Sequence, residues 1–324
     1  MAEMPITFGD VLKACERIAP YLNRTPVFTC SSADEIAGRK LFFKAENLQK
    51  TGSFKARGAL NAILLAKERK PTVAGIVTHS SGNHGQAVAW ASKCVNLPSY
   101  VVVPAMAPAS KKTAIRGYGA QLVECGSKPS DRYEACDKLQ AEKDLEMVPP
   151  FDHPDVIAGQ GSIAVELLDQ VPDLDAIMVP ISGGGMASGI AVAAKHIKPD
   201  IKVFVVSPQG KLLTDCFKSG QRLWPNPPEY LNTTADAIRL QQLGHLTFNI
   251  LSQLAEKDAF EMSDEEMVQG VKFIMHRMKL VVEMAAGAGV AAVLSDRMKS
   301  LDPAIKKVGV ILCGGNIDLD HLPW

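Results

Sequence analysis

The chain has 324 residues, 47% of them hydrophobic, which is enough to bury a large core and indicates two lobes rather than one small domain. Lys plus Arg and Asp plus Glu both number 35, so the zero net charge argues against a nucleic-acid or anionic-membrane partner. The N-terminal residues lack the basic and apolar stretches of a secretory signal, and no apolar run reaches membrane-spanning length. We therefore expect a cytoplasmic protein.

The cysteines and histidines do not predict a disulfide framework or a zinc site. The seven cysteines are scattered, their odd number prevents complete pairing, and no Cys-x-x-Cys occurs. The seven histidines show no zinc-type spacing. Reduced thiols, which are typical of cytosolic proteins, are the favoured interpretation.

Residues 50–59, KTGSFKARGA, predict the start of a helix with Ser53 as its N-cap. Lys55 falls in the first turn of this helix. The N-terminus of a helix carries partial positive charge and favours anions, so a lysine is unexpected there. This placement makes Lys55 a candidate functional residue.

From residue 74 onwards, short apolar strands alternate with helices. The predicted strands are AGIVTH, SYVVVP, AQLVEC, LDAIMVP, IKVFVVS and VGVILC. This alternation predicts an α/β fold whose parallel sheets are covered by helices on both faces. The Pro-rich residues 148–155 are a plausible crossing point between lobes, and residues 219–236 are expected at the surface.

The stretch VPISGGGMASG, residues 179–189, runs from a strand through three glycines into a helix. Such a loop can cradle a phosphate with its backbone N–H groups, although a plain tight turn is the alternative. It lacks the Gly-Lys-Ser/Thr of a P-loop. The following strand ends at Ser207 rather than at the acidic residue of a dinucleotide site, so a monophosphate is favoured.

Two further loops follow predicted strands. THSSGNHGQ offers the hydroxyls of Ser80 and Ser81 and the amide of Asn83, and can grip a small carboxylate. His84 in this loop is otherwise an ordinary helix-start histidine, and the missing Gly-x-Ser-x-Gly argues against a hydrolase. In ILCGGNIDL, Cys313 ends a strand, and a plain core cysteine is the alternative to a functional thiol.

Lys55 and these loops, taken together, indicate one kind of chemistry. A lysine near helix amides in a cleft has a lowered pKa, and a neutral amine is the form that makes a Schiff base. A solvated helix lysine is the alternative if Lys55 is taken alone. A monophosphate cradle, a carboxylate-gripping loop and this lysine together indicate pyridoxal 5′-phosphate (PLP).

Several sequence blocks, spread over essentially the whole chain, resemble those of a known enzyme family. They are RTPVFTCSS, FFKAENLQKTGSFKARGA, HSSGNHGQA, PPFDHPDVIAGQG, SGGGMASG, VVEMAAGAGVAA and LCGGNIDL. The chain resembles the fold-type II (tryptophan synthase β-like) PLP enzymes, and within them the serine racemase and serine/threonine ammonia-lyase family. The resemblance implies a two-lobed α/β fold with parallel-rich sheets flanked by helices. Residues 1–68 and 154–324 would form a large PLP-binding domain, and residues 69–153 a small domain that closes over the cleft. A homodimer is also implied.

The resemblance assigns cofactor roles to residues of these blocks. Lys55 would form the Schiff base with PLP, and Asn83 would bond the ring oxygen. Cys313 would face the pyridine nitrogen and leave it largely unprotonated, while Glu283 would lie near the ring. The phosphate loop would consist of Ser182, Gly183, Gly184, Gly185 and Met186.

The resemblance also implies a substrate site and a reaction. The loop residues Ser80, Ser81, Asn83 and His84 would hold the substrate carboxylate, and Asp155 would border the substrate. Ammonia-lyases of this family usually have Ala where Ser81 stands. Racemisation needs a second acid/base opposite the lysine, which a serine hydroxyl can supply and an alanine cannot.

Ser81 therefore favours a serine racemase that interconverts L- and D-serine by two-base proton transfer, with elimination of water to pyruvate as a side reaction. The alternatives are an L-serine/L-threonine ammonia-lyase and a non-catalytic protein of the same fold. Serine, threonine and aspartate all stay open as the preferred substrate.

Two effector sites follow from the same resemblance. ATP would bind at a subunit interface to the residues Ser31, Ser32, Thr51, Gln86, Tyr118, Lys279 and Asn316. A Mg²⁺ or Ca²⁺ site would use a Glu and a later Asp, but Ser207 stands in place of that Glu and Asp215 falls two residues late. A hard cation prefers carboxylates, which makes this metal doubtful. Ala237 replaces a usual Gly and is expected to crowd the cofactor.

Overall fold

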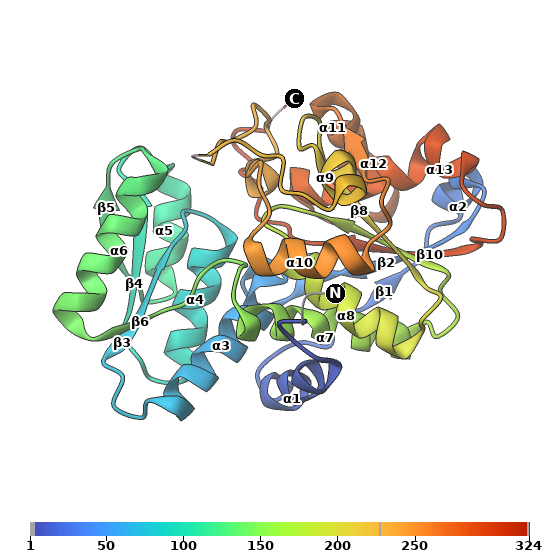
Figure 1. Cartoon of the computed structure of the whole chain (residues 1–324). Helices are drawn as coiled ribbons and strands as arrows, with labels where there is room; N and C mark the ends of the chain where they lie inside the picture. The colour runs from blue at the N-terminus through green and yellow to red at the C-terminus, as the bar shows by residue number, and fades with distance from the viewer. Residues whose placement is uncertain (1–3, 227, 323) are drawn as a thin grey trace.

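The computed structural model describes residues 4–226, 228–322 and 324, which form two parallel-rich sheets (Figure 1). The larger sheet has the order β1 (Val27–Phe28), β2 (Lys40–Ala45), β10 (Lys307–Leu312), β7 (Ala176–Pro180), β8 (Lys202–Pro208) and β9 (Phe260–Met262). The smaller sheet has the order β5 (Gln121–Cys125), β4 (Ser99–Pro104), β3 (Gly75–His79) and β6 (Leu145–Met147). Only β1 pairs antiparallel, with β2, within the described sheets.

Helices cover both faces of the larger sheet. On one face, α12 packs along β7, β8, β9 and β10, next to α11. On the other face, α7 packs against α8 and α1, and α8 against α10 (Figure 1). These helices are α1 (Phe8–Ile18), α7 (Pro154–Gln170), α8 (Gly185–Ile197), α10 (His245–Leu254), α11 (Asp264–Phe273) and α12 (Met284–Leu294). The shorter α2 (Ser31–Ala37) and α13 (Asp296–Ser300) lie together at one edge of the molecule, and α9 (Leu213–Ser219) packs against α10.

The smaller sheet is covered in the same way. α6 (Pro129–Lys143) packs on β3, β4 and β6, and α4 (Asn83–Cys94) packs on β3 and β4 beside α5 (Ala109–Gly117). α3 (Lys55–Arg69) contacts both α4 and α7, so it joins the two halves. The smaller sheet spans residues 75–147, inside the range expected for a small domain, while the domain boundaries themselves stay a prediction.

The predicted α/β alternation is confirmed. The strands expected from residue 74 onwards correspond to β3, β4, β5, β7, β8 and β10, and every pair among them is parallel. β3 and β7 are buried at every residue, which explains their continuous apolar sequence. The carboxyl ends of these strands carry the loops that the sequence singled out.

Ser53 is not the N-cap of its helix, so that prediction is wrong. Its backbone is extended and forms an isolated bridge with Gly314, and its hydroxyl is buried without a hydrogen-bond partner. α3 begins instead at Lys55, with Phe54 as the residue that caps it. The pairing with Gly314 holds Ser53 extended and delays the helix.

The expectation of a surface location for residues 219–236 holds only in part. Trp224 is 9% exposed, and its indole N–H donates a 2.7 Å hydrogen bond to the Lys211 carbonyl. Its ring packs edge-to-face against Phe248. The tertiary structure thus buries an aromatic side chain in a stretch whose local sequence is polar and Pro-rich.

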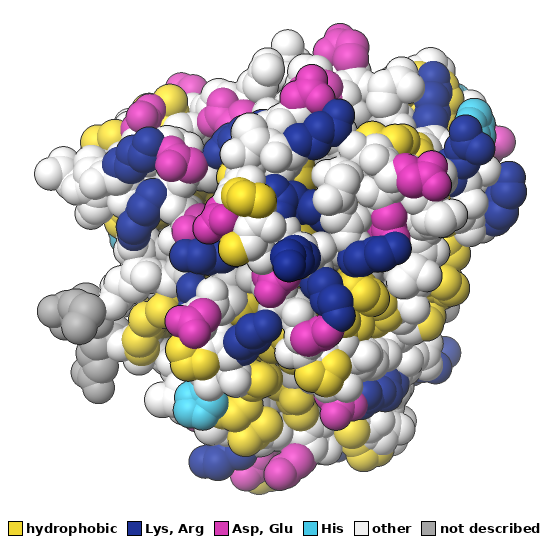
Figure 2. Space-filling view, turned by 90° about the vertical axis from the view of Figure 1, so that its right-hand side faces the viewer, with side chains coloured by type: hydrophobic (Ala, Val, Ile, Leu, Met, Phe, Trp, Pro, Cys, Tyr) yellow, Lys and Arg dark blue, Asp and Glu magenta, His cyan; other side chains and the backbone are white. Residues whose placement is uncertain are grey.

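The surface agrees with the balanced composition. Figure 2 shows Lys and Arg side chains interspersed with Asp and Glu over the face it presents, without a large area of one sign. Among the described residues, no helix has the length and hydropathy needed to cross a membrane.

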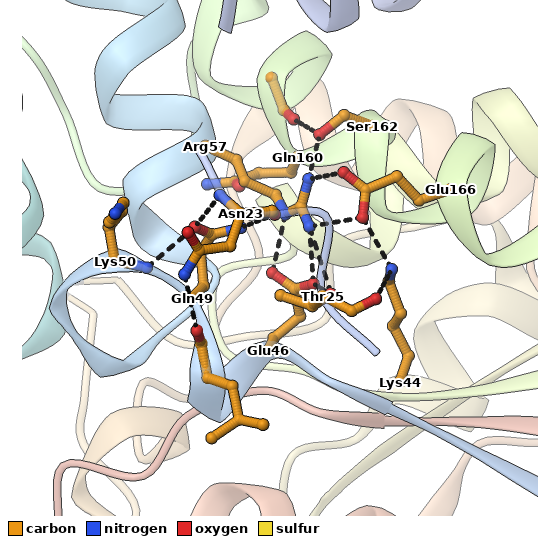
Figure 3. A network of polar contacts seen from close by, with 12 residues as sticks. Asn23, Thr25, Lys44, Glu46, Gln49, Lys50, Arg57, Gln160, Ser162 and Glu166 are labelled. Carbon is orange, nitrogen blue, oxygen red and sulfur yellow. Dashed lines mark hydrogen bonds and ion pairs between the residues drawn. The ribbon is translucent and has the colours of Figure 1, made fainter. Parts of the chain in front are cut away.

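A buried polar network ties the start of α3 to the end of β2 and to α7 (Figure 3). Arg57 is 1% exposed, and its guanidinium donates to Glu46 at 2.7 and 2.8 Å and to Glu166 at 2.7 and 2.9 Å. Lys44 donates to Glu166 at 2.7 Å and to the Thr25 carbonyl at 2.8 Å. Two cations thus balance two carboxylates, which allows all four to be buried or partly buried. The network fixes the helix that begins at Lys55.

We expect Arg57→Met to lower the free energy of unfolding, measured in urea titrations, by about 3–5 kcal/mol, because it leaves Glu46 buried without its cation. The matched control is Arg24→Ala, which removes an ion pair that is exposed on both sides. That variant should lose less than about 1 kcal/mol. Equal losses in the two variants would contradict a stabilising role for the network.

Candidate active site

A cavity of about 250 Å³ lies where the carboxyl ends of the two sheets meet. In open parallel sheets ligands bind at this edge, outside the ends of the strands. Its lining comes from the start of α3, the loop after β3, the loop after β7, the end of β10 and residues 236–240.

Lys55 enters the cavity from the first position of α3. The preceding Phe54 N–H donates a 3.1 Å hydrogen bond to the Cys313 carbonyl, which fixes the helix start against the end of β10. The Lys55 amine donates to the Pro150 carbonyl. Burial lowers the pKa of Lys55 to about 8, although nearby Cys313 and Glu283 act in the opposite direction. A substantial share of the amine is therefore neutral near physiological pH.

The glycine loop after β7 ends at the N-terminus of α8. A Cβ on Gly183 would lie 2.5 Å from the ring of Phe151, and Gly184 has a φ of +98°, so both positions favour glycine. Thr247 donates a 2.7 Å hydrogen bond to the Gly183 carbonyl and holds the loop. No side chain in the described part of the chain caps α8, so the N–H groups of its first turn suit an anion.

Asn83, Glu283 and Asn316 form a hydrogen-bonded set at the cavity wall. The Asn83 amide donates to both Glu283 carboxylate oxygens at 2.9 and 3.0 Å, and Asn316 donates to the Asn83 oxygen at 2.8 Å. Burial raises the pKa of Glu283 to about 7, against the lowering effect of the Asn83 hydrogen bond. Asn83 is thereby oriented from both ends of its amide.

Cys313 lies in the cavity lining and is 2% exposed. Burial, reinforced by nearby Glu283, raises the pKa of its thiol well above the ordinary value. The thiol therefore stays neutral. A neutral group at this position suits an unprotonated pyridine nitrogen.

The loop after β3 brings Ser80, Ser81 and His84 to the same cavity. His84 bonds the Val148 carbonyl at 2.9 Å, and burial together with the Lys55 charge lowers its pKa to about 3. It is therefore neutral and held in place. Within the described residues, the Ser81 hydroxyl has no protein hydrogen-bond partner and is available to a substrate.

Asp155 is not part of the cavity lining. Arg69 binds its carboxylate through two hydrogen bonds of 2.6 and 2.9 Å, and the Asp155 carbonyl accepts from Asn61. The structure thus does not bring this carboxylate to the other site residues. Its contact with substrate stays a prediction.

The residues expected to bind ATP do not form one cluster in a single chain. Gln86 and Asn316 line the cavity, and Asn316 donates to the Thr51 carbonyl at 2.8 Å. Ser31 and Ser32 begin α2, which lies at the opposite end of the molecule from α4 and α5 (Figure 1). Lys279 follows α11 and Tyr118 ends α5. The nucleotide site stays a prediction.

The residues present do not fit the expected divalent cation. Asp215 is exposed on α9, and Ser207 is fully buried with a hydroxyl that finds no hydrogen-bond partner among the residues that the structure describes. In the described part of the chain, no group of three or more His, Cys, Asp or Glu side chains could hold a metal ion. Ala237 lies in the cavity lining, as its expected proximity to the cofactor requires.

The sequence interpretation missed several residues of the lining. Phe151 and Arg132 reach the cavity from the Pro-rich stretch and from α6, and Tyr230 and Arg239 from irregular segments. Arg132 donates to the Tyr230 hydroxyl at 3.3 Å, and the Arg239 guanidinium lies 4.6 Å from the centre of the Tyr230 ring. No local motif marks these positions, because only the packing of distant segments brings them together.

The donor set fits PLP. The start of α8 offers N–H groups to a phosphate, Cys313 offers a neutral thiol, and the Lys55 amine is partly neutral. Pro150 and Phe151 close the cavity beside the glycine loop.

Comparisons with known proteins agree with this chemistry. Residues 18–314 match the family described as pyridoxal-phosphate dependent enzyme. The chain is 44% identical to serine racemase of Mus musculus over 329 residues, covering 100% of this chain and 95% of that protein. It is 43% identical to L-threo-3-hydroxyaspartate ammonia-lyase of Saccharomyces cerevisiae, covering 97% and 94%.

Solved structures confirm the predicted fold. A crystal structure of pyridoxal 5′-phosphate-dependent aspartate racemase has a TM-score of 0.97 and 52% identity over 100% of both chains. Because the family match spans most of the chain and the relatives cover nearly all of it, the protein belongs to the pyridoxal-phosphate dependent enzymes.

Proposed function

We propose that the protein is a PLP-dependent racemase that interconverts L- and D-serine, with elimination of water to pyruvate as a side reaction. The observation that carries this proposal is that the Lys55 amine and an unpartnered Ser81 hydroxyl line the same cavity. The full-length similarity to serine racemase of Mus musculus supports it.

The chain's own groups then have these tasks. PLP, when bound, withdraws electrons from the substrate and so acidifies the hydrogen on Cα. Lys55 holds the cofactor and moves a proton at one face of Cα with its nitrogen. The Ser81 oxygen exchanges a proton at the opposite face, which an alanine could not do.

Other residues bind and orient. The first-turn N–H groups of α8 and residues 182–186 hold the phosphate. Asn83 is directed by Glu283 and Asn316, and Cys313 would offer a neutral thiol to the cofactor ring. The loop 80–84 binds the substrate carboxylate with its hydroxyl and backbone donors.

Aspartate is a second candidate substrate, favoured by the charges at the cavity. Arg132 and Arg239 line it, and no carboxylate of the described chain pairs with either guanidinium. Among the described residues the Arg132 Nε has no hydrogen-bond partner, so it is free to donate to the side-chain carboxylate of aspartate. The similar aspartate racemase and the yeast ammonia-lyase, which is named for hydroxyaspartate, support this candidate.

We also propose the assembly that the family resemblance implies. Residues 69–153 form a small domain that closes over a large domain of residues 1–68 and 154–324, in a cytoplasmic homodimer. ATP acts as an effector at a site to which two copies contribute, which agrees with the separation of α2 from α4 and α5 in one chain.

Ser81→Ala should separate racemisation from elimination. With L-serine as substrate, we expect D-serine formation to fall by about 100-fold or more, because the second acid/base is lost, while pyruvate formation persists. Chromatography of D-serine and an assay of pyruvate measure the two products. Ser110→Ala, at an exposed serine of α5, is the matched control. A parallel loss of both products would contradict the role of Ser81, and a wild-type protein that makes only pyruvate would favour the ammonia-lyase.

Capture of PLP by the cofactor-free protein should depend on pH through Lys55. Because the neutral amine is the reactive form and the pKa is about 8, the rate of covalent capture should rise as the pH increases through about 8 and then level off. Borohydride reduction followed by peptide mass spectrometry measures the link at Lys55. Lys55→Arg is the control and should show none. A rate that is independent of pH across this range would contradict a lowered pKa.

Arg132→Ala should distinguish the two substrates. If the guanidinium binds the side-chain carboxylate, kcat/KM for aspartate should fall by about 10–100-fold, while that for serine changes by less than about threefold. Racemisation of both amino acids by wild type and variant is measured side by side. Equal changes for the two substrates would argue against aspartate recognition by Arg132.

A further inference from the structure

Lys211 is a buried lysine outside the catalytic cavity. Its side chain is 0% exposed, and burial lowers its pKa to about 7. Its nitrogen donates to the Leu240 carbonyl, and no carboxylate of the described residues pairs with it. Burying an unpaired ammonium costs several kcal/mol, so the full burial of this lysine indicates that the surrounding structure specifically accommodates its amine.

The backbone directs Lys211 inwards. It lies in the turn between β8 and α9, between Gly210 with a φ of +84° and Leu212 with a φ of +56°. Leu212 is exposed while Lys211 is buried, the reverse of their ordinary preferences. The Lys211 carbonyl accepts a 2.7 Å hydrogen bond from the buried Trp224 indole, which locks the turn.

The Leu240 carbonyl belongs to residues 236–240, which form one wall of the catalytic cavity. Leu240 forms an isolated antiparallel bridge with Tyr230, another residue of the lining. Lys211 therefore ties the β8–α9 turn to the backbone that carries Arg239. In either protonation state its nitrogen keeps N–H groups to donate.

A second, half-buried cation, Arg222, extends these contacts to the residues after Leu240. Arg222 donates to the carbonyls of Leu243 and Gly244 at 2.8 and 2.7 Å. The Gly244 N–H donates at 3.1 Å to the carbonyl of Gly183 in the phosphate loop. The stretch from Leu240 to Gly244 thus links the β8–α9 turn to both the cavity wall and the phosphate loop.

The same turn is where the family resemblance places a divalent cation. Ser207, at the end of β8, stands where a Glu is expected, and Asp215 on α9 is exposed. Lys211 lies between these two positions in the chain. The carboxylate that would bind a metal is missing, and a side chain with its own positive charge is buried instead.

We propose that Lys211 is a positioning residue that replaces the divalent cation: its nitrogen cross-links the β8–α9 turn to the cavity wall at residues 236–240, so the enzyme is active without a divalent metal. The proposal rests on the proposed function only for its kinetic consequence. Its structural part, a lysine cross-link between the β8–α9 turn and the cavity wall, stands on the contacts of Lys211 alone.

The first experiment is metal removal from the wild-type holoenzyme. Treatment with EDTA, followed by MgCl₂ or CaCl₂, should leave both the thermal midpoint and the racemase activity unchanged. A loss with EDTA that either salt restores would overturn the proposal. The thermal midpoint tests the need for a metal even if the protein does not racemise serine. A failure of the proposed function is therefore distinguishable from a failure of this proposal.

The second experiment replaces Lys211 by methionine, which has a similar length, buries no charge and is expected to fold. Lys211→Met should raise KM by about tenfold and change kcat by less than about threefold, because a wall that binds substrate loses its support while the reacting groups stay in place. The matched control is Lys218→Met on the exposed face of α9. Wild-type KM in Lys211→Met would overturn the positioning role.

A rescue variant tests the exchange of lysine for metal directly. Ser207→Glu combined with Lys211→Ala supplies the missing carboxylate and opens the space of the lysine side chain. CaCl₂ or MgCl₂ should raise the thermal midpoint of this double variant and leave that of the wild type unchanged. No shift in the double variant, at any concentration of either salt, would overturn the claim that Lys211 occupies a cation position.

Discussion

Burial of the Lys55 amine at the junction of the two sheets is the constraint on which the rest of the site depends. The amine must be kept partly neutral to react, and its removal from water is the largest effect that lowers its pKa. That burial is achieved because Phe54 is hydrogen-bonded to the end of β10 and the Lys55 amine reaches the Pro150 carbonyl. The same enclosure raises the pKa of Glu283 and of Cys313, so these neighbours shift towards their neutral forms.

A reactive lysine at the start of a helix needs a rigid support, and buried charges provide it. Arg57, two residues after Lys55, is bound by Glu46 and Glu166 and connects α3 to β2 and α7. Lys211 holds the Leu240 carbonyl of the cavity wall, and Arg222 holds the carbonyls of Leu243 and Gly244 that follow it. Charged groups are costly to bury, but each has specific partners that fix one arrangement of segments. Polar contacts therefore position the segments that form the cavity walls, and apolar side chains pack around those segments.

Much of the fold and of the site followed from local sequence. The strands from residue 74 onwards were predictable because buried parallel strands are short apolar runs between helices. The glycine loop and Lys55 were predictable because phosphate binding and amine chemistry require particular residue types next to each other. Ser53 was wrongly expected to cap α3, because the competing bridge to Gly314 comes from the far end of the chain. The pairing of Asp155 with Arg69 is also a long-range contact that no local pattern marks, and the contact of Asp155 with substrate stays a prediction.

By itself, the sequence determined the α/β class, the PLP chemistry and the central lysine, since each is read from short motifs whose own residues are adjacent along the chain. Only the tertiary structure decided which charges line the cavity and which lysine is buried next to its wall. Arg132, Tyr230 and Arg239 meet at the cavity from segments about a hundred residues apart, and Lys211 is exposed or buried only according to how its turn packs. Side-chain burial and long-range contacts set those properties, and neither is encoded in local residue patterns.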